Sequence, residues 1–177
     1  MFKPRALTLA SLILAAAASR LIPHPWNLTS VAALALFGGA TFEDRRLAFL
    51  APLAALALSD LVLGFYPGMA FVYASFLVVA ALGLWLRGRR APGPILAASL
   101  AGSLLFFVLT NFGVWAEGLL YPRSLAGLAA CYAAALPFLR QTLEGDLLYT
   151  VLLFGGFALL ERRFPVLRPA AALPQPA

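Results

Sequence analysis

A few polar side chains interrupt long apolar runs, and they are the residues whose types could do chemistry. Asp60 lies within SDLVLGF, Asn111 and Trp115 within TNFGVWAE, and Asp146 and Tyr149 within GDLLYT. On a helix, residues three or four positions apart share a face, so Asn111 lies beside Trp115 and Asp146 beside Tyr149. Two helical faces would then combine hydrogen-bonding and aromatic groups. Such a mixture, set in mostly apolar walls, is typical of a pocket for a small molecule.

The composition places these residues in a membrane protein. The chain has 177 residues, of which 63% are hydrophobic and 11% charged, whereas a soluble domain has about 25% charged residues. The length favours a single domain. The net charge of +6 comes from basic clusters between apolar runs, which is the positive-inside pattern rather than a nucleic-acid surface. With Cys131 as the only cysteine, an internal disulfide and a cysteine-based metal cluster are excluded.

The charged clusters also predict the topology. They lie before the first apolar run and after the second, fourth and last, so the number of crossings is even if all are cytoplasmic. We therefore expect an all-α bundle with both termini cytoplasmic in a bacterial inner membrane. The segment 123–140 has an arginine at each end and Pro137 within it, which favours a helix that stays at the outer face. The single domain would span 1–163, with a disordered tail at 164–177 and six spans at about 6–22, 27–42, 47–66, 69–86, 94–115 and 143–160.

The first run allows a second interpretation. MFKPRALTLASLILAAAAS combines a basic start, an apolar centre and a small-residue site, which is also the design of a cleaved secretory signal. Cleavage would leave the orientation of the other spans unchanged.

With this orientation, most unusual polar residues fall on the outer side. At about 1.5 Å per residue, Asp60 lies roughly 20 Å and Asn111 roughly 25 Å above the inner ends of their spans. The outer side would also hold Glu117 and the loop that carries His24, Trp26 and Asn27. A carboxylate in hydrocarbon is costly and marks a functional site or an internal partner. For Asp60 the structural alternative is a bond to Asn111 or Arg20.

Simpler explanations apply to several of these residues. An aromatic belt at the membrane surface would account for Trp26, Trp115 and other outer aromatic residues. Glu117 would then be a solvated loop acid, and Asp146 would suit the positive end of its helix. Enzyme motifs such as HExxH, GxSxG, the Walker lysine and CxxC do not occur, and the chain has one histidine. We therefore expect neither an enzyme nor a metal or cofactor.

Small residues predict close helix packing in the first spans. Ala6 and Ala10 form one small-residue pair, and Ala35 and Gly39 form another. Such pairs let helix backbones approach closely in lipid. They would serve either internal packing or the docking of a partner membrane protein.

Two blocks of the chain, which begin SRLIPHPWN and TNFGVWAEG, resemble the hallmark blocks of a small bacterial membrane-protein family without an assigned function. More remotely, six spans, the pair Gly38 and Gly39, and Asp60 on the third helix resemble the S components of energy-coupling-factor vitamin transporters. The resemblance implies a coupling surface at Ala6 and Ala10 for a transmembrane subunit that works with ATPases. It also implies an outer lid made of Pro23, His24, Pro25, Trp26 and Asn27. The segment 123–140 departs from that pattern.

These observations predict a solute-binding membrane protein that takes up a small vitamin-like or metal-related nutrient from the outer face. Asp60, Asn111, Trp115, Asp146 and Tyr149 would line the site, and the ligand would also contact His24, Trp26, Asn27 and, at the rim, Glu117. An excess of outer acids favours a cationic or amine-bearing ligand. The alternatives are a structural or assembly protein with an internal polar network and, third, an intramembrane enzyme that uses Asp60 and Asp146 as an acid pair.

Overall fold

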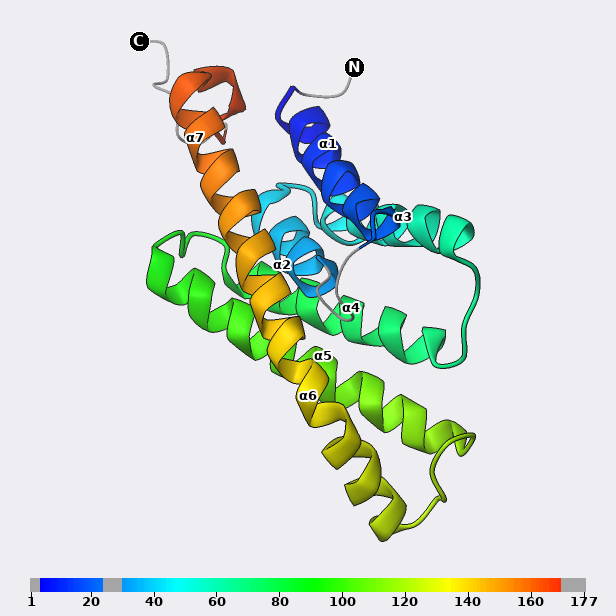
Figure 1. The fold of residues 1–177 in the computed structure, drawn as a ribbon. Coiled ribbons are helices and arrows are strands. Elements are labelled where there is room, and N and C mark those ends of the chain that lie inside the picture. Colours follow the sequence, from blue (N-terminus) through cyan, green and yellow to red (C-terminus); the bar gives the residue numbers. More distant parts are fainter. Residues whose placement is uncertain (1–3, 24–29, 170–177) are drawn as a thin grey trace.

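The computed structural model describes residues 4–23 and 30–169, and within this part every regular element is helical (Figure 1). The all-α expectation is therefore confirmed for the described residues. In chain order, the elements are α1 (Pro4–Ala18), the 3-10 turn η1 (Ser19–Leu21), α2 (Val31–Thr41), α3 (Arg45–Leu63), α4 (Met69–Trp85), α5 (Pro92–Glu117), α6 (Leu125–Thr150), the π-helical turn η2 (Val151–Gly155), α7 (Gly156–Arg163) and the 3-10 turn η3 (Pro165–Leu167).

Among the described residues, three helices are long and apolar enough to cross a membrane. They are α3 with 19 residues, α5 with 26, and the continuous helix Leu125–Arg163 with 39. About 20 apolar residues suffice for a hydrocarbon core of about 30 Å. Helices α2 and α4 are apolar but have only 11 and 17 residues. The lengths of the three long helices indicate an integral membrane protein.

The expected division between 123–140 and 143–160 is wrong, because α6, η2 and α7 form one continuous helix. Pro137 lies inside it without ending it. No glycine or second proline stands between Pro137 and Glu144 to stop the helix, and Arg140 Nε donates to Glu144 Oε1 one turn later at 2.7 Å. At 1.5 Å per residue the helix is roughly 58 Å long, about twice the hydrocarbon thickness. Part of it must therefore tilt or extend beyond the membrane core.

Helix α2 is the centre of the fold, and all of its residues are buried. Its glycine pair explains the close packing. A Cβ on Gly39 would stand 2.1 Å from the Ala80 carbonyl oxygen and 2.9 Å from Gly83 Cα of α4. A Cβ on Gly38 would stand 2.2 Å from Pro52 Cγ of α3. Because neither glycine has a side chain, α3 and α4 can approach α2 from two sides.

The charged clusters of the sequence meet at one end of the molecule. Arg5, at the start of α1, is ion-paired with Glu161 of α7 and donates from Nη2 to the Thr41 oxygen at 3.0 Å. Arg87, after α4, donates to the Phe42 oxygen at 2.7 Å. The first and last helices therefore reach the same end of the molecule. We name this the inner end and the opposite one the outer end, after the orientation that the charge pattern predicts.

Regular structure continues past 163, the position at which we placed the end of the domain, as far as η3. Leu167 in η3 is buried, and its carbonyl oxygen accepts a hydrogen bond from Arg5 Nη1. Most expected helix boundaries are close to the observed ones. Helix α2 begins at Val31, and its expected start at 27 lies outside the described residues.

Candidate functional site

A cavity of about 300 Å³ lies at the outer end, beside the first turn of α2. Helices α5 and α6 supply most of its polar wall, and phenylalanine side chains of α5 supply an aromatic wall. Its lining combines apolar and hydrogen-bonding groups from elements far apart in the sequence, namely Arg20, Val31, Ala32, Tyr66, Val72, Phe106, Phe107, Thr110, Asn111, Val114, Thr142 and Asp146.

Asp146 joins α6 to the start of α2. Its Oδ1 accepts from the Ala33 backbone N–H at 3.2 Å, and its Oδ2 accepts from Ser103 Oγ at 2.7 Å. The first N–H groups of a helix have no partner within the helix, and the helix dipole favours negative charge there. The carboxylate thus caps a buried helix from a neighbouring one. Asp146 is 2% exposed, so only a small part of this residue faces the cavity.

Asp60 lies behind the cavity rather than on it. It is fully buried and ion-paired with Arg20, whose Nη2 is 2.8 Å from Asp60 Oδ1, and it accepts from the Tyr73 hydroxyl at 3.0 Å. Arg20 also donates to Ser59 Oγ, and it lines the cavity. Burial raises the pKa of the cavity residue Tyr66, and the Asp60 charge raises it further. The Tyr66 phenol is therefore a neutral hydrogen-bonding group at physiological pH.

Asn111 is the amide in the cavity wall. Its Nδ2 donates to the Phe107 oxygen at 2.8 Å, one turn earlier on α5, and this bond fixes the side chain against its own helix. Thr110 Oγ1 donates to the Phe106 oxygen at 2.8 Å in the same way. The backbone oxygen of Asn111 also accepts from Cys131 Sγ at 3.4 Å, which ties α5 to α6. The amide is thus held by a rigid helix pair.

Other residues that the sequence assigned to the site form their hydrogen bonds away from the cavity. The Trp115 indole N–H donates to the oxygens of Pro122 and Ser124 at 3.1 and 3.2 Å, in the loop that joins α5 to α6. The Tyr149 hydroxyl donates to Ser19 Oγ at 2.7 Å, and Glu117 accepts from the Gly68 N–H. None of the three is among the residues that line the outer cavity. His24, Trp26 and Asn27 of the expected lid lie outside the described residues.

The small-residue pairs contribute to internal packing. Ala35 is buried on α2, and Gly39 meets Gly83 of α4. On α1, Ala6 is partly buried and packs against the hydrophobic core, and Ala10 is partly buried. The exposed positions of α1 include Leu7, Ser11 and Leu14 instead.

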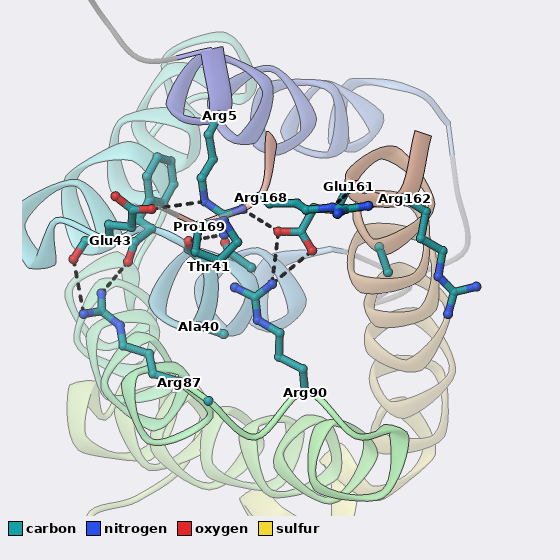
Figure 2. A pocket seen from close by; sticks show the side chains of 13 residues that line it. Arg5, Ala40, Thr41, Glu43, Arg87, Arg90, Glu161, Arg162, Arg168 and Pro169 are labelled. Atoms are coloured by element: carbon teal, nitrogen blue, oxygen red, sulfur yellow. Dashed lines mark hydrogen bonds and ion pairs between the residues drawn. The ribbon is translucent and has the colours of Figure 1, made fainter. Parts of the chain in front are cut away.

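A larger cavity, of about 600 Å³, lies at the inner end (Figure 2). Arg5 and Arg90 point toward Glu161 from opposite sides, and Arg162 points away from them. Arg90 Nη1 is 3.0 Å from Glu161 Oε2. The lining is rich in arginine and consists of Arg5, Ala40, Thr41, Phe42, Glu43, Arg87, Gly88, Arg90, Ala158, Glu161, Arg162, Arg168 and Pro169.

Sequence reasoning missed the inner cavity because its arginines fit the positive-inside pattern. Arg5 nevertheless carries a signal. It is 5% exposed and shares a face with Leu9 and Ile13, which follow at intervals of four residues and are also buried. A basic residue in register with a buried apolar face is expected to have an internal partner. At the outer end, Thr110 and Thr142 were missed because hydroxyl groups occur throughout apolar helices, and Tyr66 was attributed to the aromatic belt at the membrane surface.

Within the described residues, no group of three or more histidine, cysteine or acidic side chains is placed to hold a metal ion. A family model, described as a family of unknown function (DUF6580), matches residues 1–167, nearly the whole chain. No curated protein and no solved structure matches the chain. The likeness to S components therefore rests on the sequence pattern alone.

Proposed function

We propose that this chain, which belongs to the DUF6580 family of unknown function, is a multi-pass membrane protein that binds a small solute in its outer cavity. The solute would enter from outside and cross the membrane with a partner coupling module and its ATPases. The chain would cross the membrane six times, with both termini in the cytoplasm.

The observation that carries this proposal is the outer cavity. Its volume of about 300 Å³ is at the lower end of the range of roughly 300–1,000 Å³ that small-molecule sites occupy. Half of its lining residues are apolar, and Asn111, Thr110 and Tyr66 are among the polar groups placed between them. The sequence assigned Asn111 and Asp146 to such a site, and both line the cavity.

The charges of the cavity indicate the class of solute. Arg20 is neutralised by Asp60, and the Asp146 carboxylate is held by Ser103 and the start of α2. Ionic recognition therefore contributes little, and amide, hydroxyl and aromatic contacts remain. They suit a compact, vitamin-like solute with a ring and hydrogen-bonding groups, stacked against Phe106 or Phe107.

The arrangement of the helix ends supports the six crossings. Contacts of Arg5, Arg87 and Arg90 bring the start of α1, the ends of α2 and α4, and the start of α5 to one end, together with α7. The chain thus alternates in direction from helix to helix. Basic residues gather at this end, which the positive-inside rule assigns to the cytoplasm.

Ligand-dependent thermal stability tests the proposal. The purified protein is screened against vitamins, nucleobases and amino acids, because a ligand that binds the folded state raises its melting temperature by mass action. Asn111→Leu should abolish the shift that a hit produces, since it removes the amide from the wall. Gln141→Leu is the matched control, because Gln141 is an amide that does not line the cavity, and it should keep the shift. If both variants keep it, the solute does not bind in this cavity.

One observation favours a structural function instead. Asp60 and Asp146, the two buried acids, both have internal partners and each joins separate helices. If the screen gives no hit while Asp60→Asn and Asp146→Asn each lower the melting temperature, the structural protein replaces the solute-binding one. An enzyme that uses these acids as a pair would first have to release both from those partners.

A further inference from the structure

The inner cavity holds more positive charge than its carboxylates neutralise. Its lining includes five arginines and two glutamates. Glu161 is paired with Arg5 and with Arg90, and Glu43 Oε1 lies 3.9 Å from Arg5 Nε. The lining as a whole therefore carries three uncompensated positive charges.

Two of the arginines are bonded to backbone oxygens rather than to acids. Arg87 donates to the oxygens of Gly39 and Phe42 at 3.1 and 2.7 Å, and Arg168 Nε donates to the Glu161 backbone oxygen at 3.2 Å. A carbonyl oxygen satisfies an N–H group but has no formal charge to cancel the guanidinium. Burial lowers the pKa of Arg87, and the nearby charge of Arg45 lowers it further, whereas the charge of Asp44 acts in the opposite direction. An anion bound here would favour the charged form of Arg87 by Coulombic attraction.

The cavity also offers donors that are not in use within the described part of the chain. The bonds of Arg90 there are made by Nη1 and the bond of Arg168 by Nε, which leaves N–H groups on both guanidiniums. The buried Nε of Arg5 has no hydrogen-bond acceptor among the described residues. A guanidinium offers pairs of parallel N–H groups that match the oxygens of a phosphate.

We propose that the inner cavity binds a phosphate-bearing anion, whose phosphate group lies between Arg90 and Arg168. Arg5 and Arg87, fixed at the end of α2, supply the surrounding positive charge. The cavity, at about 600 Å³, is larger than a phosphate ion, so the anion carries a further group. Basic pockets between helices on the cytoplasmic side bind the headgroups of anionic lipids, and a soluble phosphate ester has the same chemistry. This site is separate from the proposed solute site, which lies at the opposite end of α2.

The test compares ligands and variants on the purified full-length chain. One arm measures the melting temperature in inorganic phosphate and glycerol phosphate against chloride at equal ionic strength. The other counts phosphatidylglycerol molecules retained in native mass spectrometry, against phosphatidylcholine. The variants are Arg168→Gln, which removes a donor from an exposed position, Arg168→Lys, which keeps the charge, and Arg163→Gln. Arg163 is the matched control, because it is exposed at the same end but does not line the cavity.

We expect one of the two phosphate sources to bind the wild-type protein. Arg168→Gln should weaken its apparent affinity about tenfold, Arg168→Lys less, and Arg163→Gln not measurably. Stabilisation by the soluble phosphates identifies a soluble ester, and selective retention of phosphatidylglycerol identifies a lipid headgroup. If the wild-type protein discriminates in neither arm, or if Arg163→Gln weakens binding as much as Arg168→Gln, the proposal is wrong, because only general attraction between charges would remain. The wild-type comparison stands even if a variant fails to fold.

Discussion

The two ends of helix α2 are stabilised by opposite charges. At the outer end, the Asp146 carboxylate accepts the Ala33 N–H, and at the inner end Arg5 and Arg87 donate to the oxygens of Thr41 and Phe42. Both arrangements satisfy backbone groups that a short buried helix leaves without partners, and both match the helix dipole. Each end also borders a cavity. The charge that holds α2 in place therefore sets the chemistry of the adjoining cavity.

The two ends of α2 differ in the net charge of the groups that surround the adjoining cavity. At the outer end Asp60 is ion-paired with Arg20, and the Asp146 carboxylate is hydrogen-bonded by Ser103 and by the start of α2. The remaining polar groups of the cavity wall beside them are neutral. At the inner end arginines outnumber acids, so the cavity keeps a positive field. The outer cavity thus suits a neutral solute and the inner one an anion.

The largest effect should come from Arg5→Met, which tests the inner end. The substitution leaves the oxygens of Thr41 and Leu167 without a donor and removes one partner of Glu161. Breaking a buried ion pair costs about 3–5 kcal/mol, and we expect a loss of that order in the unfolding free energy in detergent. Arg163→Met is the control and should cost less than about 0.5 kcal/mol. Equal losses would mean that Arg5 is merely a surface charge.

The next effect concerns the helix that both ends share. Gly39→Ala places a Cβ 2.1 Å from the Ala80 oxygen, and α2 and α4 must separate. Overpacking of this kind costs about 1–3 kcal/mol. Gly156→Ala is the matched control, because a Cβ there meets nothing within 4 Å. The control should be neutral or slightly stabilising in a thermal unfolding assay, since alanine favours a helix more than glycine does. Similar melting temperatures for the two variants would contradict the close crossing.

A smaller effect is expected when the outer cap is removed. Asp146→Leu leaves the Ala33 N–H without its acceptor, which costs about 1–3 kcal/mol. The Ser103 hydroxyl loses its bond to the carboxylate but keeps the Ser99 oxygen, at 3.0 Å, as an acceptor. Glu144→Leu changes the same charge two residues earlier, where the acid is half exposed and paired with Arg140. This control should cost less than about 1 kcal/mol. Denaturant unfolding of both variants measures the difference. A larger loss for Glu144→Leu would show that Asp146 does not anchor α2.

The sequence predicts the outer end better than the inner end for a physical reason. Asp60 and Asn111 stand alone in apolar runs, so their cost in hydrocarbon draws attention to them. Arg5 and Arg87 stand in clusters that membrane topology alone explains, and their burial depends on how the helix ends meet. Local sequence patterns do not predict how the helix ends pack together. The one indication is the four-residue spacing of Arg5, Leu9 and Ile13, which places Arg5 on a buried face.

Helix α6 shows a second limit. The expectation that 123–140 is separate from the last span relied on Pro137 and on the charges Arg140 and Glu144. A single proline removes one hydrogen bond, and the two charges pair with each other along the helix at 2.7 Å. A continuous helix therefore tolerates the proline and the two charges. The composition of this segment indicates where its apolar stretch is interrupted, but not where the helix ends.

The smallest effect separates the cavity from the aromatic surface around it. Trp115→Phe keeps an aromatic ring beside Phe112, whose ring centroid is 5.4 Å away, and removes the N–H that reaches Pro122 and Ser124. We expect a loss of about 0.5–1.5 kcal/mol, the usual net contribution of a hydrogen bond. Because Trp115 does not line the outer cavity, the stabilisation by a bound solute should be unchanged, whereas Asn111→Leu abolishes it. A thermal titration of both variants with the same solute measures this. If Trp115→Phe lowers the solute response as much as Asn111→Leu, then Trp115 belongs to the site, as the shared helical face first indicated, and the cavity extends toward the loop that joins α5 to α6.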